Sequence, residues 1–322
     1  MAQVNEQEIS GIAAVVAICV ADHDEIAAEV SRIAPDVDVR VPGHMGDPTE
    51  IDAIVCWKPQ PGLLSSLTKL QLIQSTGAGV DGIVGDPHRN PWTPIARTID
   101  RDIAVGMTAY VRWAVVDHFK GMDRFRADRV HQRWNQFVAP SPERHAVGFA
   151  GVGELGLACL RDLASAGFAT RCWSRQPKVG LPESTKRFAG DSELAEFLRG
   201  CNSLVCLLPL TPSTKGFLGK SVFDLLPEGA HVINVARGEH LVEPDLLAAF
   251  DSGQVSRATL DVFAQEPLPA GHPFWTRPEI TITPHIAARA SARSIAEQLL
   301  ANLAAVRAGK VPQHCVDARA GY

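Results

Sequence analysis

Short apolar runs alternate with amphipathic helical patterns along most of the chain. The runs have the length of buried strands and form two sets, at 13–20, 37–41, 52–57, 71–75 and 94–98, and at 146–150, 169–173, 203–208, 230–235, 256–262 and 280–283. Apolar residues recur at helical spacing between them, for example at 155–166, 192–199, 242–251 and 291–307. This alternation is typical of an α/β fold with parallel sheets covered by helices on both faces.

The order of these elements indicates two domains, as does the length of 322 residues. A long helical pattern at about 104–127 separates the two sets of strands, and the last helix begins after the final strand of the second set. We expect this helix to return to the first domain. One domain would then comprise residues 1–105 and 287–322, the other residues 106–286, with a site in the cleft between them.

Composition narrows the classes of function. The apolar fraction is 46%, the charged fraction 21% and the formal net charge −5, so neither a nucleic acid nor a membrane is expected as partner. The apolar run at 11–20 has about half the roughly 18 residues of a membrane span, and the polar residues before it argue against a signal peptide. The seven cysteines lack C-x-x-C spacing, which favours reduced thiols in a cytoplasmic protein and no metal site.

A glycine-rich segment follows the apolar run at 146–150. It reads Gly151-Val152-Gly153-Glu154-Leu155-Gly156, a G-x-G-x-x-G pattern between a predicted strand and a predicted helix. In this context the first glycine permits a tight turn, the second lets a pyrophosphate approach the backbone, and the third lets helix and strand pack closely. The helix N-terminus adds amide N–H groups and partial positive charge. The segment predicts a dinucleotide site; a glycine-rich turn without a ligand is the alternative.

The end of the next predicted strand bears on which dinucleotide binds. NAD sites usually place Asp or Glu about 20 residues after the glycines, where it binds the ribose 2′-hydroxyl. Residues 172–178 read CWSRQPK and contain no carboxylate. The hydroxyl of Ser174, the guanidinium of Arg175 and the ammonium of Lys178 suit a 2′-phosphate instead. The sequence predicts NADP, with NADPH preferred over NAD; a solvated basic turn is the alternative.

Three polar side chains follow predicted strands of the second set. Arg237 follows 230–235, Glu266 follows 256–262 and His285 follows 280–283. Because ligands in open α/β sheets lie outside the carboxyl ends of the strands, we expect the three to converge. Reduction of a 2-keto acid needs these residue types. Arg can bind the carboxylate, His can donate a proton to the carbonyl oxygen, and Glu can orient the imidazole and favour its protonated form. Each residue alone would more often be structural.

Motifs along nearly the whole chain resemble the D-isomer-specific 2-hydroxyacid dehydrogenase family. They are GAGVD at 77–81, GVGELG at 151–156, LLPLTPST at 207–214, NVARG at 234–238, LDVFAQEPLP at 260–269 and TPHIAA at 283–288. The segments WSR at 173–175, WKP at 57–59 and the ending VDARAGY resemble its glyoxylate/hydroxypyruvate reductase A subgroup. The resemblance implies two Rossmann-like domains: a flavodoxin-like substrate domain (1–105, 287–322) and an NAD(P)-binding domain (106–286).

The resemblance also implies roles for individual residues. It implies catalytic roles for Arg237, Glu266 and His285, and a contact between Asp261 and the nicotinamide carboxamide. Backbone N–H groups of Ala78 and Gly79 would bind the substrate carboxylate. Further cofactor contacts are expected next to the adenine end and after the strand at 230–235, from Leu208, Pro209, Val235 and Ala236. The family commonly has Glu where this chain reads Met-Thr-Ala-Tyr at 107–110, so contacts of that stretch are open.

The substrate and the assembly complete the expected function. Trp57 at the end of a predicted strand would form a pocket wall and leave room only for small keto acids, glyoxylate and hydroxypyruvate. The segment 107–137 carries aromatic residues expected at the surface, Trp113, Phe119, Phe125 and Trp134. In the resembling family this region forms a two-fold interface, so a homodimer is expected. Trp134 would reach the partner's active site or pack inside its own chain.

Two other functions remain open at this point. One is an NAD-dependent D-2-hydroxyacid dehydrogenase for another substrate, of the phosphoglycerate type, which would place an acid near position 174. The other is a dinucleotide-sensing binding module, which would not need the acid–base pair. A panel of 2-keto acids with NADPH and NADH would separate them.

Overall fold

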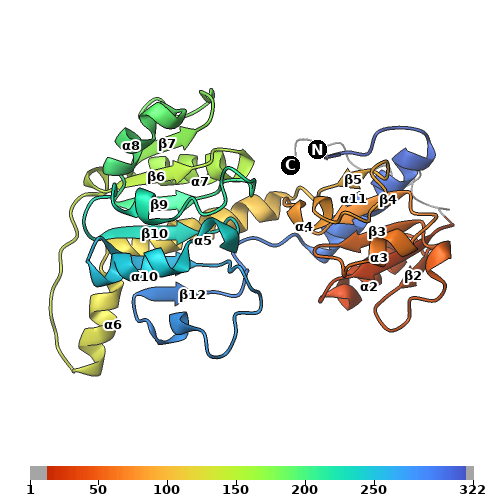
Figure 1. Cartoon of the computed structure of the whole chain (residues 1–322), viewed down its shortest axis with the longest axis horizontal. Helices are drawn as coiled ribbons and strands as arrows, with labels where there is room; N and C mark the ends of the chain where they lie inside the picture. Colours follow the sequence, from red (N-terminus) through yellow and green to blue (C-terminus); the bar gives the residue numbers. More distant parts are fainter. Residues whose placement is uncertain (1–12, 317–322) are drawn as a thin grey trace. The chain divides into compact units, whose positions relative to one another are not determined.

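The computed structural model describes residues 13–316 and divides the chain into two compact units (Figure 1). The first comprises Met1–Ile103 and Arg289–Tyr322, and the second comprises Ala104–Ala288. These boundaries lie two residues from those expected from the sequence. The polar segment before the first strand, and residues 317–322 of the ending VDARAGY, lie outside the described residues.

The first unit is built on a five-stranded parallel sheet. Its strands are β1 (Val15–Cys19), β2 (Asp38–Arg40), β3 (Ala53–Cys56), β4 (Leu72–Ser75) and β5 (Ile95–Ala96). Their order is β2-β1-β3-β4-β5, and all four neighbouring pairs are parallel. This is the 2-1-3-4-5 order of flavodoxin-like sheets, as the sequence predicted.

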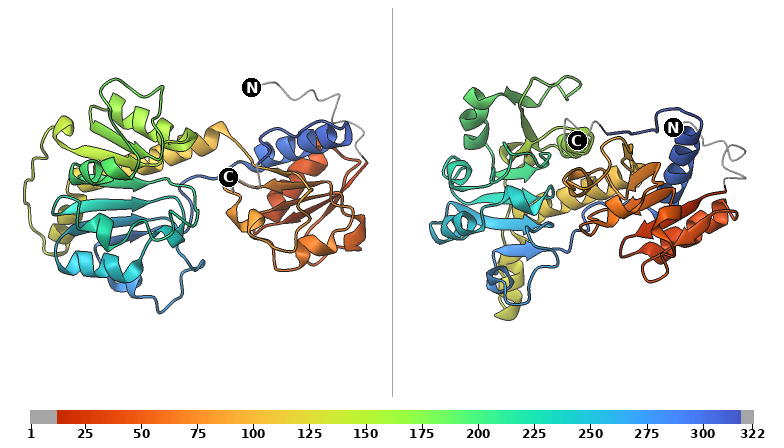
Figure 2. Two further views of the ribbon diagram at one scale, coloured as in Figure 1. Left: turned by 45° about the horizontal axis from the view of Figure 1, so that its top comes forward. Right: turned by 45° about the vertical axis from the view of Figure 1, so that its right-hand side comes forward.

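Helices cover both faces of this sheet. Long helices α2 (His23–Ile33) and α11 (Ala292–Arg307) pack side by side on the face that carries Val16 and Ile18 (Figure 2). The short helices α3 (Leu63–Ser66) and α4 (Asp81–Val84) pack on the other face of the strands, and a 3₁₀ turn, η1 (Pro48–Glu50), precedes β3. The last helix thus belongs to the first unit.

The second unit is built on a seven-stranded parallel sheet. Its strands are β6 (Ala146–Ala150), β7 (Ala169–Ser174), β8 (Lys186–Ala189), β9 (Ser203–Cys206), β10 (Ala230–Asn234), β11 (Val255–Leu260) and β12 (Ile280–Ile282). They lie in the order β12-β11-β10-β9-β6-β7-β8. Counted from β6, this is the 3-2-1-4-5-6 Rossmann order with one further strand, and the order reverses between β6 and β9. A dinucleotide would bind at that reversal.

Two sets of helices bury the two faces of the second sheet. Helices α5 (Arg101–Phe119) and α7 (Glu154–Ser165) share one core with Val147 and Phe149. Helices α8 (Asp191–Arg199), α9 (Lys220–Phe223) and α10 (Glu243–Asp251) share the other core with Ala150 and Cys206. Helix α6 (Met122–Val130) and the 3₁₀ turns η2 (Pro142–Arg144), η3 (Gly238–His240) and η4 (Pro273–Thr276) complete the unit.

Several local expectations are corrected. The helical pattern at 104–127 is not one helix, because Gly121 adopts a left-handed conformation with φ 62° and separates α5 from α6. Strand β8 was not predicted, since its sequence KRFA lies at a sheet edge, is largely exposed and lacks an apolar run. Phe119 is not at the surface. It is 6% exposed and packs edge-on against Phe168.

Trp134 and the cysteines also differ in part from expectation. Trp134 is 94% exposed, so an intrachain core role for it is wrong. All seven cysteines are free thiols, and five are buried, but Cys315 is exposed. Among residues 13–316 no helix is long and apolar enough to cross a membrane. The same residues contain no group of three or more His, Cys, Asp and Glu side chains that could hold a metal ion.

Candidate active site

The glycine segment after β6 has the geometry that a dinucleotide needs. Gly151 has φ 98°, and a Cβ there would lie 2.6 Å from the Leu207 carbonyl oxygen. A Cβ at Gly156 would lie 2.3 Å from the Gly151 carbonyl oxygen, so the third glycine permits the close packing expected of it. A Cβ at Gly153 would meet nothing within 4 Å. The open space therefore lies at the second glycine, at the N-terminus of α7, where the sequence places the pyrophosphate.

The other expected cofactor residues surround the same strand ends. Val152, Val235, Ala236 and Leu208 are buried, Leu155 is half-buried, and Glu154 and Pro209 are exposed. The contact between Gly151 and Leu207 shows that the loops after β6 and β9 meet where the strand order reverses. These residues thus fit a dinucleotide that lies across the reversal.

The end of β7 exposes two cations. Ser174 is 8% exposed, and its hydroxyl donates to the Gln176 carbonyl oxygen over 2.7 Å. Arg175 and Lys178 follow on the exposed turn. The Ser174 hydroxyl proton is engaged within the turn, so the two cations are the better candidates for a 2′-phosphate contact. That contact stays a prediction.

Glu266 and His285 form the pair expected from the sequence. The Nδ1 atom of His285 lies 3.1 and 3.2 Å from the two carboxylate oxygens of Glu266, and the side chains are 31% and 24% exposed, respectively. Glu266 is anchored in turn, because its Oε1 accepts the Phe263 amide N–H over 3.0 Å. With Nδ1 facing the carboxylate, Nε2 is the nitrogen that can meet a substrate.

Arg237 lies on a turn that packs against the Glu266 segment. Gly238, the next residue, has no room for a side chain: a Cβ there would lie 1.9 Å from the Phe263 carbonyl carbon. The turns after β10 and β11 are therefore in direct backbone contact. Arg237 is half-buried and donates from Nη1 to the Ala236 carbonyl oxygen over 2.6 Å. The structure thus brings the turns that carry Arg237 and Glu266 together.

Asn234 was not assigned a role from the sequence but shapes the arginine turn. It is fully buried at the end of β10. Its amide nitrogen donates to the Arg237 carbonyl oxygen over 2.9 Å, and its amide oxygen accepts the Ala236 N–H over 3.2 Å. A buried Asn at a strand end, directly before a functional turn, is the signal that could have identified it.

Asp261 holds the turn that carries His285. It is 1% exposed, and its carboxylate accepts from the Thr283 hydroxyl (2.6 Å) and from the amides of Ile286 and Ala287 (2.9 Å each). Its carbonyl oxygen accepts the His285 N–H over 2.8 Å. The carboxylate is therefore used within the chain, and its expected contact with the nicotinamide carboxamide stays a prediction.

Three of the residues expected at the substrate, Trp57, Ala78 and Gly79, lie in the first unit, whereas Arg237 and His285 belong to the second. The Trp57 ring lies beside Gly77, since a Cβ there would be 3.2 Å from Trp57 Cζ3. Ala78 and Gly79 are half-buried, and their amide N–H groups have no hydrogen-bond partner among residues 13–316. The Ser75 hydroxyl donates to the Gly79 carbonyl oxygen over 2.8 Å and holds the loop in place. Two adjacent unpaired N–H groups suit a carboxylate.

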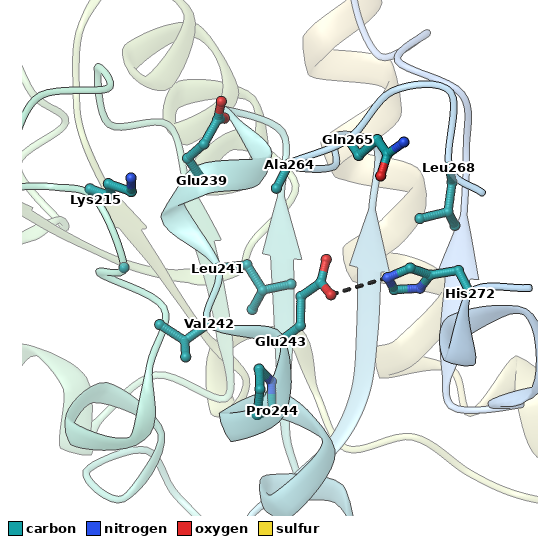
Figure 3. Close-up of a pocket in the computed structure, with 11 residues that line it drawn as sticks. Lys215, Glu239, Leu241, Val242, Glu243, Pro244, Ala264, Gln265, Leu268 and His272 are labelled. Atoms are coloured by element: carbon teal, nitrogen blue, oxygen red, sulfur yellow. Dashed lines mark hydrogen bonds and ion pairs between the residues drawn. The ribbon is translucent and has the colours of Figure 1, made fainter.

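A pocket of about 480 Å³ lies beside the turns of Arg237 and Glu266 in the second unit (Figure 3). Its polar wall includes Glu243 and His272, whose side chains face each other at 3.1 Å. Glu239 and Gln265, which are close in sequence to Arg237 and Glu266, also line it. Arg237, Glu266 and His285 are not among its lining residues, so this pocket is distinct from the candidate active site.

Known proteins resemble this chain over most of its length. The NAD-binding domain of the D-isomer specific 2-hydroxyacid dehydrogenases matches residues 113–287. A glyoxylate/hydroxypyruvate reductase A from Yersinia enterocolitica is 40% identical over 282 residues, which are 86% of this chain and 90% of the relative. A protein of the same description from Serratia proteamaculans is 38% identical over 93% of this chain and 96% of its own.

Solved structures give the same result. A D-isomer specific 2-hydroxyacid dehydrogenase from Xanthobacter autotrophicus, in complex with NADPH and MES, superposes with a TM-score of 0.88 at 35% identity and covers 96% of this chain and 100% of its own. An NADPH-dependent glyoxylate/hydroxypyruvate reductase from Sinorhizobium meliloti, with NADP and sulfate, has a TM-score of 0.88 at 32% identity, with 96% and 99% covered. The chain therefore belongs to the D-isomer-specific 2-hydroxyacid dehydrogenase family, whose members act on CH–OH groups with NAD or NADP, and within it to the glyoxylate/hydroxypyruvate reductase A subgroup.

Proposed function

We propose that this protein reduces small 2-keto acids, glyoxylate and hydroxypyruvate, to D-2-hydroxy acids with NADPH. The observation that carries the proposal is the His285–Glu266 pair at 3.1 Å, at the carboxyl ends of a Rossmann sheet and beside the turn of Arg237. A sensor would not need such a pair. The names of the relatives from Yersinia and Sinorhizobium support the same substrates.

In this proposal His285 is the general acid. NADPH, when bound, supplies the hydride to the carbonyl carbon of the substrate. The imidazolium of His285 gives the Nε2 proton to the carbonyl oxygen, and the negative charge of Glu266 on the Nδ1 side stabilises the charged ring before transfer. One hydride and one proton are thereby added across the carbonyl. His285 regains its proton from solvent in the next cycle, since its side chain is 31% exposed.

Arg237 and the loop at Ala78 and Gly79 bind the substrate in this proposal. The guanidinium would hold the carboxylate by charge-assisted hydrogen bonds and polarise the carbonyl. The unpaired N–H groups of Ala78 and Gly79 would donate hydrogen bonds to the same carboxylate. Trp57, whose ring lies against Gly77, would limit the size of the substituent on the keto carbon.

The first prediction concerns this size limit. Glyoxylate and hydroxypyruvate should both be reduced with NADPH, and phenylpyruvate should have a much lower kcat/KM, because an indole at position 57 leaves little room. The measurement is kcat/KM for glyoxylate, hydroxypyruvate, pyruvate and phenylpyruvate, in the wild type and in Trp57→Ala. The variant should gain activity toward phenylpyruvate relative to glyoxylate. If phenylpyruvate ranks first in the wild type, the size argument is wrong although the enzyme class survives.

The second prediction concerns the cofactor. A charge-assisted hydrogen bond contributes about 1.5–3 kcal/mol, roughly 10–100-fold in affinity, so Arg175→Ala should weaken NADPH much more than NADH. Lys186→Ala removes an exposed cation from the neighbouring edge strand β8 and should leave the ratio unchanged. Titration of both cofactors into the three proteins gives the ratio. Equal kcat/KM with NADPH and NADH in the wild type would contradict the assignment and favour the NAD-dependent alternative.

The third prediction concerns assembly, since we propose a homodimer. Three large apolar side chains near the end of α6 and just after it are strongly exposed: Val130 (73%), Trp134 (94%) and Val138 (88%). A second copy of the chain is the partner that closed two-fold symmetry favours. Light scattering at micromolar concentration should report a dimer, and Val130→Asp with Val138→Asp should shift it toward monomer. A monomeric wild type would refute the proposal.

A further inference from the structure

A hydrogen-bonded relay of three side chains connects α5 to the turn of His285. The Tyr110 hydroxyl lies 2.5 Å from the Thr283 hydroxyl oxygen, and the Thr283 hydroxyl donates to Asp261 Oδ1 over 2.6 Å. Thr283 has one hydroxyl proton and uses it on Asp261, so its oxygen accepts from Tyr110. The hydrogen bonds therefore run in one direction, from Tyr110 through Thr283 to Asp261.

Asp261, the last residue of this relay, holds the backbone at His285 and directly after it. Asp261 accepts the N–H groups of His285, Ile286 and Ala287. His285 has φ 55°, a left-handed conformation that is costly for a residue with a side chain and persists only where the surroundings hold it. In this conformation Nδ1 meets Glu266 at 3.1 Å. The contacts of Asp261 therefore keep the imidazole of His285 oriented toward Glu266.

Tyr110 is itself well held. It lies between Met107 and Val111 on α5, and these two residues are buried in the core that α5 shares with α7. Its ring packs edge-on against Trp113 with centroids 5.3 Å apart. Burial raises the pKa of the Tyr110 phenol, so the group keeps the proton that it donates to Thr283. The hydroxyl donor of Tyr110 is therefore held in place in the middle of α5.

We propose that Tyr110 is a positioning residue for the proton donor, acting through Thr283 and Asp261 on the turn of His285. This inference rests on the proposed role of His285 in reduction. It gives a role to the stretch at 107–110, where this chain departs from the common family pattern. Without the Tyr110 hydroxyl, Thr283 loses its donor and can rotate, and Asp261 then holds the turn less tightly.

The test uses Tyr110→Phe, which keeps the ring and removes the hydroxyl. We expect kcat for glyoxylate to fall about 3–10-fold, the loss of one hydrogen bond, while the Kd of NADPH stays unchanged. The pH profile of kcat should also change, because the contact of the general acid with Glu266 becomes looser. A role confined to stability would lower Tm without changing the pH profile.

Three companion variants sharpen the result. Thr283→Val should reproduce the loss, Thr283→Ser should restore it, and the double variant of Tyr110→Phe with Thr283→Val should be no worse than either alone. Thr108→Val removes another hydroxyl from α5, one that faces Cys159 instead, and should have no effect. Additive losses, or an unchanged kcat and pH profile in Tyr110→Phe, overturn the proposal.

A substrate-free measurement separates this inference from the proposed function. The imidazole signals of His285 can be compared by NMR at one pH in the wild type and in Tyr110→Phe. A change of these signals in the variant supports positioning even if no keto acid is reduced, and unchanged signals refute it. Absence of reduction in the wild type with every keto acid and both cofactors refutes the proposed function.

Discussion

His285→Ala is expected to lose about 10²–10⁴-fold in kcat for glyoxylate while it binds NADPH almost as well as the wild type. The variant removes the proton donor and leaves the glycine loop and the strands untouched. The side chain of His285 is 31% exposed and lies at the end of a turn, so the fold should persist. Cofactor binding by fluorescence titration and kcat by NADPH absorbance measure the two quantities.

Two variants make this prediction specific. His272→Ala breaks another His–Glu contact of the same length, the one with Glu243, and should keep near-wild-type turnover. Arg237→Ala should raise KM as well as lower kcat, because it removes a substrate contact that is present before and during reduction. Near-wild-type turnover in purified, folded His285→Ala would remove the histidine from the mechanism.

Much of the fold could be predicted because the buried residues of each strand and helix recur at a regular spacing in the sequence. Val16 and Ile18 face one helix layer and Ala17 the other, so β1 reads as a continuous apolar run between two covered faces. Helices α7 and α8 begin and end within one residue of the patterns that predicted them. Edge strand β8 escaped prediction because one side of it lacks a neighbouring strand and its side chains need not be apolar.

The site was predictable where it coincides with a motif and not where it depends on contacts across the fold. Arg237, Glu266 and His285 each follow a strand, and that position alone suggested them. The packing of Gly238 against Phe263 joins two turns that lie about 25 positions apart, and no spacing rule encodes it. Asp261 illustrates the limit: the motif indicates that it is functional, but only its hydrogen bonds show that it holds the turn of His285.

A cluster of three histidines, two buried and one half-buried, was equally hidden in the sequence. The rings of His118 on α5 and His231 on β10 are tilted to one another with centroids 4.7 Å apart, and the His118 centroid lies 5.8 Å from that of His145 before β6. His145 Nε2 lies 2.9 Å from the Ser203 hydroxyl, and His231 Nε2 lies 2.9 Å from the Thr259 hydroxyl. Within the described residues, the buried Nδ1 of His231 has no hydrogen-bond partner. A proton placed there would have no acceptor.

This cluster predicts that the second unit loses stability in mild acid. Burial lowers the pKa of all three histidines, that of His145 to about 4, and each positive ring would repel the others. Asp117 and Asp123 near His118 oppose this effect, while Arg124 and Arg257 add to it. Below pH 6.5 these histidines therefore bind protons in the unfolded chain but not in the folded one. The stabilisation is complete above pH 6.5 and declines as the pH falls toward 4.

The expected loss is large for a single residue. For His145 the difference between a pKa of 6.5 and one of about 4 corresponds to about 3 kcal/mol of unfolding free energy, lost at roughly 1.4 kcal/mol per pH unit.

Urea unfolding from pH 7.5 to 4.5 measures the slope of the unfolding free energy against pH. His145→Gln should reduce that slope by about one proton even if it lowers stability at every pH, whereas His88→Gln, at an exposed position, should leave it unchanged. Carboxylates titrate equally in all three proteins, so the difference in slope isolates the histidine. An identical slope in His145→Gln and the wild type between pH 6.5 and 5 would show that the buried cluster does not govern the acid sensitivity of the protein.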